Sequence, residues 1–81
     1  MYTTFSIPLD MIPSGVWADV VDVYGDSAWI VRLAEMGLRS GSRVRVVQSG
    51  QPCLVEIGAT RLSLRGEEMS QILVQPAESM T

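Results

Sequence analysis

The chain has 81 residues, which is the size of one small domain, and the core of so short a chain has little spare stability. Hydrophobic residues make up 47% of it, which excludes a disordered chain. The net charge is −3, with six arginines and no lysine, and this acidic balance argues against nucleic-acid binding as the main role.

The N-terminal part predicts a turn followed by a strand. Residues 8–12 suit one helical turn, and Pro-Ser-Gly at 13–15 favours a tight turn. Residues 16–23 are rich in β-branched side chains and predict a strand. The adjacent apolar pair Val20 and Val21 breaks the alternation of the strand, so we expect a bulge or strong bend at this pair.

A short amphipathic helix is predicted next. Asp26 or Ser27 can serve as the N-cap, and the helical pattern extends to about Met36. Gly37 can adopt the left-handed conformation that ends a helix, and Leu38 would then pack back on the last turn. The apolar stripe of this helix consists of Ile30, Leu33 and Met36, with Trp29 beside them.

The second half of the chain predicts short strands separated by turns. A single helical turn is expected at 66–69, and Pro76 ends the last strand. The strands are expected at 43–47, 54–57, 60–64 and 72–74. Together with the first strand, they indicate a mostly β fold. We expect a small five-stranded barrel with one short amphipathic α-helix across an open end.

The order and spacing of these motifs resemble the FeoA family. The helix end Leu-Ala-Glu-Met-Gly-Leu at 33–38 is followed by Gly41 and a valine-rich strand at 44–47, as in that family. Segments 61–65 and 67–74 are similar to its last two strand elements. The resemblance also includes Leu9 and Gly15 and covers about residues 8–76.

The resemblance implies a fold and a role. The fold is an SH3-like barrel over residues 8–76, and we expect residues 1–7 and 77–81 to be flexible ends. The role is that of a cytoplasmic accessory protein of bacterial ferrous iron transport. It would bind the cytoplasmic region of FeoB, a membrane GTPase and transporter, and reach the membrane only through that partner.

Two alternatives remain open. The same domain type occurs at the C-terminus of iron- and manganese-dependent repressors, so the chain could be a stand-alone regulatory domain. A nucleic-acid-binding small barrel is the other alternative, and the acidic balance argues against it.

Metal binding and catalysis are not expected. The chain has no histidine, and Cys53 is its single cysteine. Transition-metal sites need several such donors, and nucleophilic catalysis needs a base beside the nucleophile. We therefore expect no metal site, no cofactor, no small-molecule substrate and no enzymatic activity. Cys53 is interpreted as a small apolar filler.

The expected function is therefore protein–protein interaction. The favoured interpretation of the stripe is that Ile30 and Leu33 cover the barrel end, and the other is that part of it docks a partner helix. Leu33 ranks first among the partner-binding candidates because it is the leucine of the family's helix motif. Trp17 would face outward if Ala18 and Val20 face inward. The candidates are Arg32, Leu33, Met36, Arg39 and Trp17.

The expected compartment is the cytoplasm. A lone cysteine forms no disulfide within the chain and is typical of a reducing compartment. The first residues lack the basic and apolar regions of a signal peptide, and no apolar run approaches the ~18 residues of a membrane span.

Overall fold

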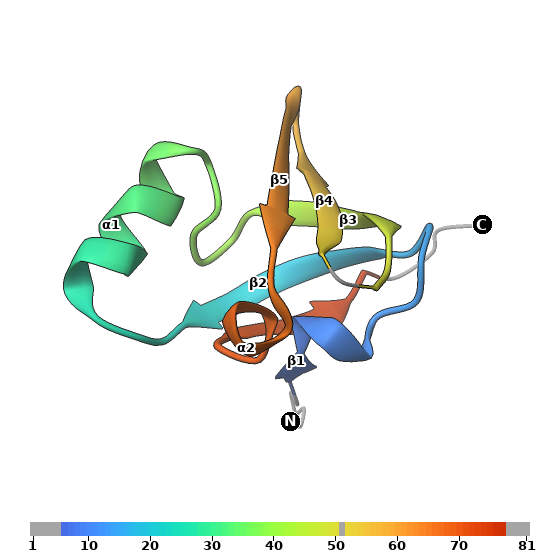
Figure 1. Ribbon diagram of the computed structural model, residues 1–81, viewed down its shortest axis with the longest axis horizontal. Helices are drawn as coiled ribbons and strands as arrows, with labels where there is room; N and C mark the ends of the chain where they lie inside the picture. The colour runs from blue at the N-terminus through green and yellow to red at the C-terminus, as the bar shows by residue number, and fades with distance from the viewer. Residues whose placement is uncertain (1–5, 51, 78–81) are drawn as a thin grey trace, which may run out of the picture.

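One antiparallel sheet of six strands, in the order β1-β6-β2-β3-β4-β5, curls around the core. The computed structural model describes residues 6–50 and 52–77 (Figure 1). The strands are β1 (Ile7–Pro8), β2 (Trp17–Val23), β3 (Arg43–Gln48), β4 (Cys53–Ile57), β5 (Thr60–Leu64) and β6 (Ile72–Pro76). The helical elements are the 3₁₀ turn η1 (Leu9–Met11), the helix α1 (Ser27–Glu35) and the short helix α2 (Gly66–Met69). The predicted mostly β fold is confirmed.

The core is built by the alternation of side chains along the strands. Val44 and Val46 of β3 are fully buried, whereas Arg43 beside them is exposed. Ile72 and Val74 of β6 face the same interior. Leu9 on η1 and Met69 on α2 are also buried, so these two short elements cover the core beside the strands. The buried apolar side chains thus form one core.

The predicted irregularity in the first long strand is confirmed. The pairing of β2 with β6 shifts register between Val20, which faces Val74, and Asp22, which faces Leu73. The extra residue lets two neighbouring valines occupy one strand without breaking the core face. A second shift, in β3 between Val46 and Gln48, was not predicted.

The start and stop of α1 follow the predicted chemistry. Asp26 is the N-cap, and its Oδ1 accepts the N–H of Trp29 at 2.9 Å. Gly37 has φ +98°, and its N–H donates to the Ala34 carbonyl at 3.0 Å. The N–H of Leu38 donates to the Leu33 carbonyl at 2.9 Å, which completes a Schellman motif. Leu38 is fully buried and anchors this end of the helix.

The strand count differs from the sequence prediction. Five strands were expected, and the sixth is β1, whose Ile7 faces Val74 of β6. A two-residue strand that includes a proline has no alternation to detect. Ile7, expected in a flexible end, is therefore part of the sheet, and the N–H of Ala77 bonds to the Trp17 carbonyl at 3.0 Å. The rest of the expected flexible ends, apart from Ser6, lies outside the described residues.

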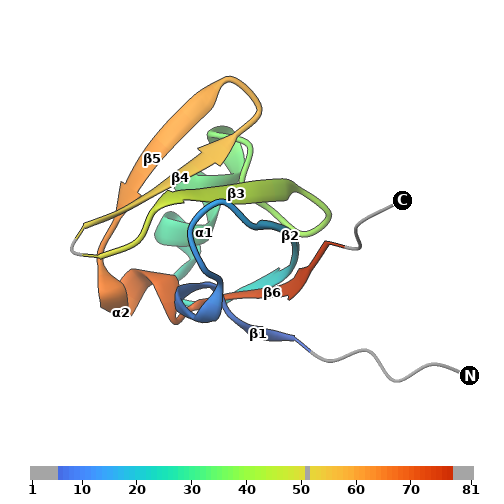
Figure 2. The same cartoon turned by 90° about the vertical axis from the view of Figure 1, so that its right-hand side faces the viewer.

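The outer strands of the sheet are β1 and β5. Figures 1 and 2 show β5 and β4 as a hairpin that projects from the rest of the sheet, with β5 outermost. The helix α1 lies to one side of the sheet, and η1 lies on the opposite side (Figures 1 and 2).

None of the helices in the described part of the chain has the length and apolar character that a bilayer crossing requires.

Candidate protein-binding surface

The five candidate residues do not form one surface. Leu33 is only 1% exposed and belongs to the core, so its side chain does not reach a partner in this structure. The favoured interpretation of the stripe, that it covers the barrel end, agrees with the burial of Leu33. Trp17 begins β2, whereas α1 follows the other end of that strand, so Trp17 is separated from the helix candidates by the length of β2. Arg32, Met36 and Arg39 remain together around the helix.

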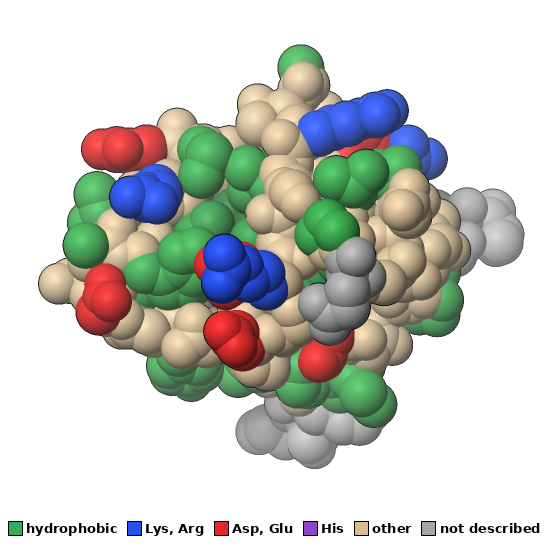
Figure 3. Space-filling view, in the orientation of Figure 1, with side chains coloured by type: hydrophobic (Ala, Val, Ile, Leu, Met, Phe, Trp, Pro, Cys, Tyr) green, Lys and Arg blue, Asp and Glu red, His purple; other side chains and the backbone are tan. Residues whose placement is uncertain are grey.

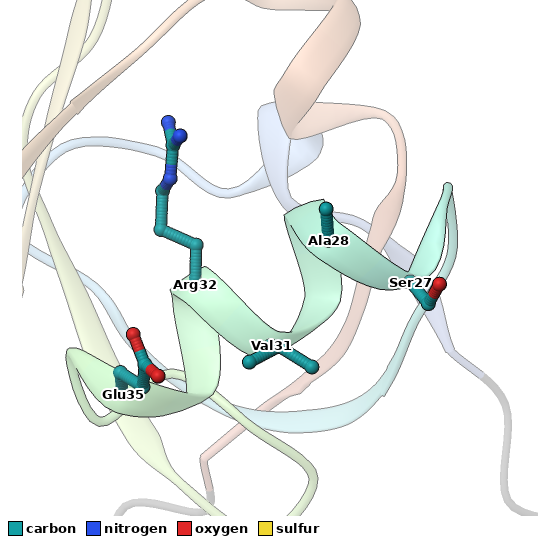
Figure 4. A pocket seen from close by; sticks show the side chains of 5 residues that line it. All are labelled: Ser27, Ala28, Val31, Arg32 and Glu35. Atoms are coloured by element: carbon teal, nitrogen blue, oxygen red, sulfur yellow. The ribbon is translucent and has the colours of Figure 1, made fainter.

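The outer face of α1 is exposed and partly apolar. Val31 is 54% exposed, although it is an aliphatic residue in the middle of the helix. It lines a shallow, open hollow together with Arg32, the next residue, and Glu35, one turn further along the helix (Figure 4). Neither charged group makes an ion pair within the described part of the chain. We call this surface the α1 outer face, and it consists of Ser27, Ala28, Val31, Arg32 and Glu35.

The segment after α1 is held in one conformation by serine side chains. The Ser42 hydroxyl donates to the Gly37 carbonyl at 2.5 Å and accepts the N–H of Arg39 at 3.1 Å. The Ser40 hydroxyl donates to the Val21 carbonyl at 2.9 Å. These bonds fix the backbone of Arg39 while its side chain stays exposed. Met36, by contrast, is half-buried against the core and offers only part of its side chain.

Trp17 lies on the outer face of the sheet, as its alternation with Ala18 and Val20 predicted. Its side chain is 42% exposed, whereas Ala18 and Val20 are buried. The guanidinium carbon of Arg45 stands 5.4 Å from the centroid of the Trp17 ring, in a cation–π arrangement. Arg45 therefore orders this ring but also covers part of it.

Ion pairs cross the same outer face. Arg43 Nε donates to Asp19 Oδ1 at 2.9 Å, and this pairing raises the pKa of Arg43 further above its ordinary range. Arg45 Nη2 lies 2.8 Å from Glu56 Oε1, and Arg61 Nε lies 3.8 Å from Glu56 Oε2. Sequence reasoning did not find these pairs, because they depend on which strands are neighbours and in what register.

Cys53 is buried at the base of a small cavity of about 220 Å³ between η1, α2 and the turn after β3. Burial, and secondarily the negative charge of Asp10, raises the pKa of its thiol. We therefore expect Cys53 of the folded protein to react with a disulfide reagent more slowly than the same thiol in urea, with its pH profile shifted to higher pH. Absorbance of the released thiolate measures both. Equal rates would show that the thiol is accessible and not shielded by the core.

The carboxylates and the cysteine do not converge. Within residues 6–50 and 52–77, no three Cys, Asp or Glu side chains lie close enough together to hold a metal ion. The features that stand out on the surface are therefore the α1 outer face and the outer face of the sheet. Among the described residues, neither surface places a nucleophile beside a base.

The family model and the similar solved structures point to the same family. The model of the FeoA domain matches residues 7–76. The FeoA protein of Chlorobium tepidum has a TM-score of 0.84 and 26% identity, over 93% of this chain and 74% of that protein. The FeoA of Stenotrophomonas maltophilia, solved with zinc and described as an SH3 domain protein, has a TM-score of 0.74 and 32% identity, over 89% and 91%.

A manganese-dependent transcriptional repressor shares the fold, with a TM-score of 0.79 over 95% of this chain and 45% of that protein, at 20% identity. IdeR of T. acidophilum superposes with a TM-score of 0.82 over 95% of this chain and 37% of that protein, at 13% identity. At these identities the likeness concerns the fold alone. The comparison with curated protein sequences returned no significant match.

Proposed function

The chain belongs to the FeoA family, and from this membership we propose that it is a non-enzymatic accessory protein of bacterial ferrous iron transport. Its partner is the cytoplasmic region of FeoB, so the protein acts in the cytoplasm and meets the membrane only through that partner. The proposal is supported by the similarity to the S. maltophilia protein, which is described as possibly a bacterial ferrous iron transport activating factor.

The observation that carries the proposed mechanism is the exposed apolar residue on α1. Val31 has no packing role in the core, and Arg32 and Glu35 surround it with one charge of each sign. An apolar centre with a charged rim is the usual arrangement of a protein-binding patch. The α1 outer face docks on FeoB, and Arg39 at the end of the helix extends the charged rim.

We expect the substitution Val31→Glu to weaken binding to the cytoplasmic region of FeoB by about tenfold or more, because it buries a charge at the centre of the contact. The measurement is a titration followed by calorimetry or interferometry. An exposed helix position tolerates such a change within about 0.5 kcal/mol of folding stability, so the variant stays folded.

Met11→Glu is the matched control for this experiment. Met11 is an exposed apolar residue on η1, on the opposite side of the sheet from α1 (Figures 1 and 2), so the variant adds the same charge without touching α1. If both variants bind as the wild type does, the α1 outer face is not the interface. If the wild type itself does not bind, the proposed partner is wrong.

The exposed Trp17 favours a second candidate function, a regulatory domain that binds a proline-rich or other extended segment. An exposed aromatic ring on an SH3-like sheet is the feature such segments contact. A titration with proline-rich peptides, followed by tryptophan fluorescence, distinguishes this function from the first, because the FeoB interaction proposed above leaves Trp17 uncovered.

A further inference from the structure

The open edge of β5 carries backbone groups that have no partner in the described part of the chain. The hairpin of β4 and β5 turns through two residues, Gly58 and Ala59, with φ +58° at the glycine. A two-residue turn makes its flanking pair, Ile57 and Thr60, exchange backbone hydrogen bonds. In an antiparallel pair, bonded and non-bonded positions then alternate along the strands.

The alternation determines which groups face outward. Leu62 and Leu64 bond to β4, so the N–H and C=O groups of Arg61 and Ser63 point away from it. No described residue accepts the N–H of either. The next outward N–H, that of Arg65, is taken by Glu68 Oε1 at 2.8 Å, which closes the edge at that end. About four backbone groups, on two residues, thus form an open edge.

The two faces beside this edge differ in chemistry. On the outer face, Arg45 and Arg61 share one carboxylate, Glu56. Arg45 holds it at 2.8 Å and Arg61 only at 3.8 Å, and the Arg61 side chain is 61% exposed. This face therefore has an excess of positive charge in a chain whose net charge is −3. On the inner face, Leu62 is half-buried. Figure 3 shows several hydrophobic side chains between α1 and the centre of the view, among charged and other groups.

We propose that the β5 edge binds an extended segment of a partner protein that alternates acidic and apolar residues, by adding it to the sheet as a further strand. The backbone groups of Arg61 and Ser63 supply the hydrogen bonds. The acidic side chains of the added strand face Arg61, and the apolar ones face Leu62. The proposal goes beyond the FeoB interaction, because it uses neither α1 nor any property of that partner.

A second copy of the chain is a poorer occupant of this edge. Its own β5 would bring further arginines to the face that already has an excess of positive charge. Natural edge strands avoid pairing with copies of themselves by such charges. The same charges favour an acidic strand.

The experiment is an NMR titration of the ¹⁵N-labelled full chain with a synthetic peptide of alternating valine and glutamate. We expect the largest shifts at the amides of Arg61 and Ser63, and weaker binding at higher salt. A peptide of alternating valine and lysine serves as the charge control and is expected to bind at least tenfold more weakly.

Three variants test the backbone and the charge separately. Ser63→Pro removes the outward N–H and abolishes the shifts, whereas Ser63→Thr keeps that N–H and binds as the wild type does. Arg61→Glu reverses the preference between the two peptides and keeps the proposal testable even if the proline variant fails to fold.

Several outcomes would overturn the proposal. One is equal binding of the two peptides. Others are shifts centred on Trp17 or α1, or no shifts at millimolar peptide. Self-association of the free chain that is lost in Ser63→Pro would assign the edge to a second copy instead.

Discussion

Replacing Leu33 by alanine is expected to lower the free energy of unfolding by about 2–5 kcal/mol. The side chain is 1% exposed and links α1 to the core, so the deletion leaves a cavity that the surrounding strands cannot fill. Small domains have total stabilities of about 5–10 kcal/mol, and the variant would therefore lose a large part of its stability. Urea unfolding followed by far-UV circular dichroism measures this loss.

Val31→Ala is the matched control for this prediction. It removes an aliphatic side chain from the same helix, two residues earlier, at an exposed position. We expect a change within about 0.5 kcal/mol, because little buried surface is lost. Equal destabilisation by the two variants would contradict the assignment of Leu33 to the core and of Val31 to the surface.

Gly25→Ala is expected to destabilise the protein by about 2–4 kcal/mol, through two separate effects. The backbone φ at Gly25 is +126°, a conformation that alanine adopts only with strain. The added Cβ would also lie 2.6 Å from Cδ1 of Trp29, whose side chain packs against the core. The ring cannot move away without leaving its place against the core, so the clash adds to the strain.

Gly50→Ala separates the two effects. Gly50 has nearly the same φ, +128°, but a Cβ there meets no atom of the described residues within 4 Å, apart from its chain neighbours. We expect this variant to lose about 1–2 kcal/mol, from strain alone. Thermal unfolding of the two variants side by side measures the difference. If Gly25→Ala lowers the free energy of unfolding no more than Gly50→Ala does, the close approach of Trp29 to Gly25 does not add to the destabilisation.

Most of the fold could be predicted from local sequence chemistry. Asp26, Gly37 and Leu38 define the limits of α1 through backbone hydrogen bonds that depend only on near neighbours. The bulge could also be predicted, because two adjacent valines cannot both follow a period of two. The strand β1 could not, since Ile7 and Pro8 form a strand only because β6 lies beside them.

The candidate site was less predictable than the fold. An apolar stripe such as that of Ile30, Leu33 and Met36 has the same sequence pattern whether it covers a core or binds a partner. The structure decides this for Leu33 and draws attention instead to Val31, an apolar residue outside the stripe. The sequence did contain a signal for Val31. An aliphatic side chain outside the buried stripe of a short helix has no packing role, so its position could have marked it as a surface candidate.

The surface pairs of the sheet could not be predicted for a different reason. Glu56 meets Arg45 and Arg61 because three strands lie side by side in one register. Register is a property of the assembled sheet, and the shift between Val46 and Gln48 shows how one unpredicted residue changes it.

The pairing of β1 with β6 has a consequence for how this domain can be combined with others. Ile7 faces Val74, so the first and last strands of the fold enter and leave at neighbouring points of the sheet. A polypeptide can therefore carry the unit at either end, or as an insert with a short connector on each side, without altering the order of its strands. Modular reuse of this kind requires no change to the core.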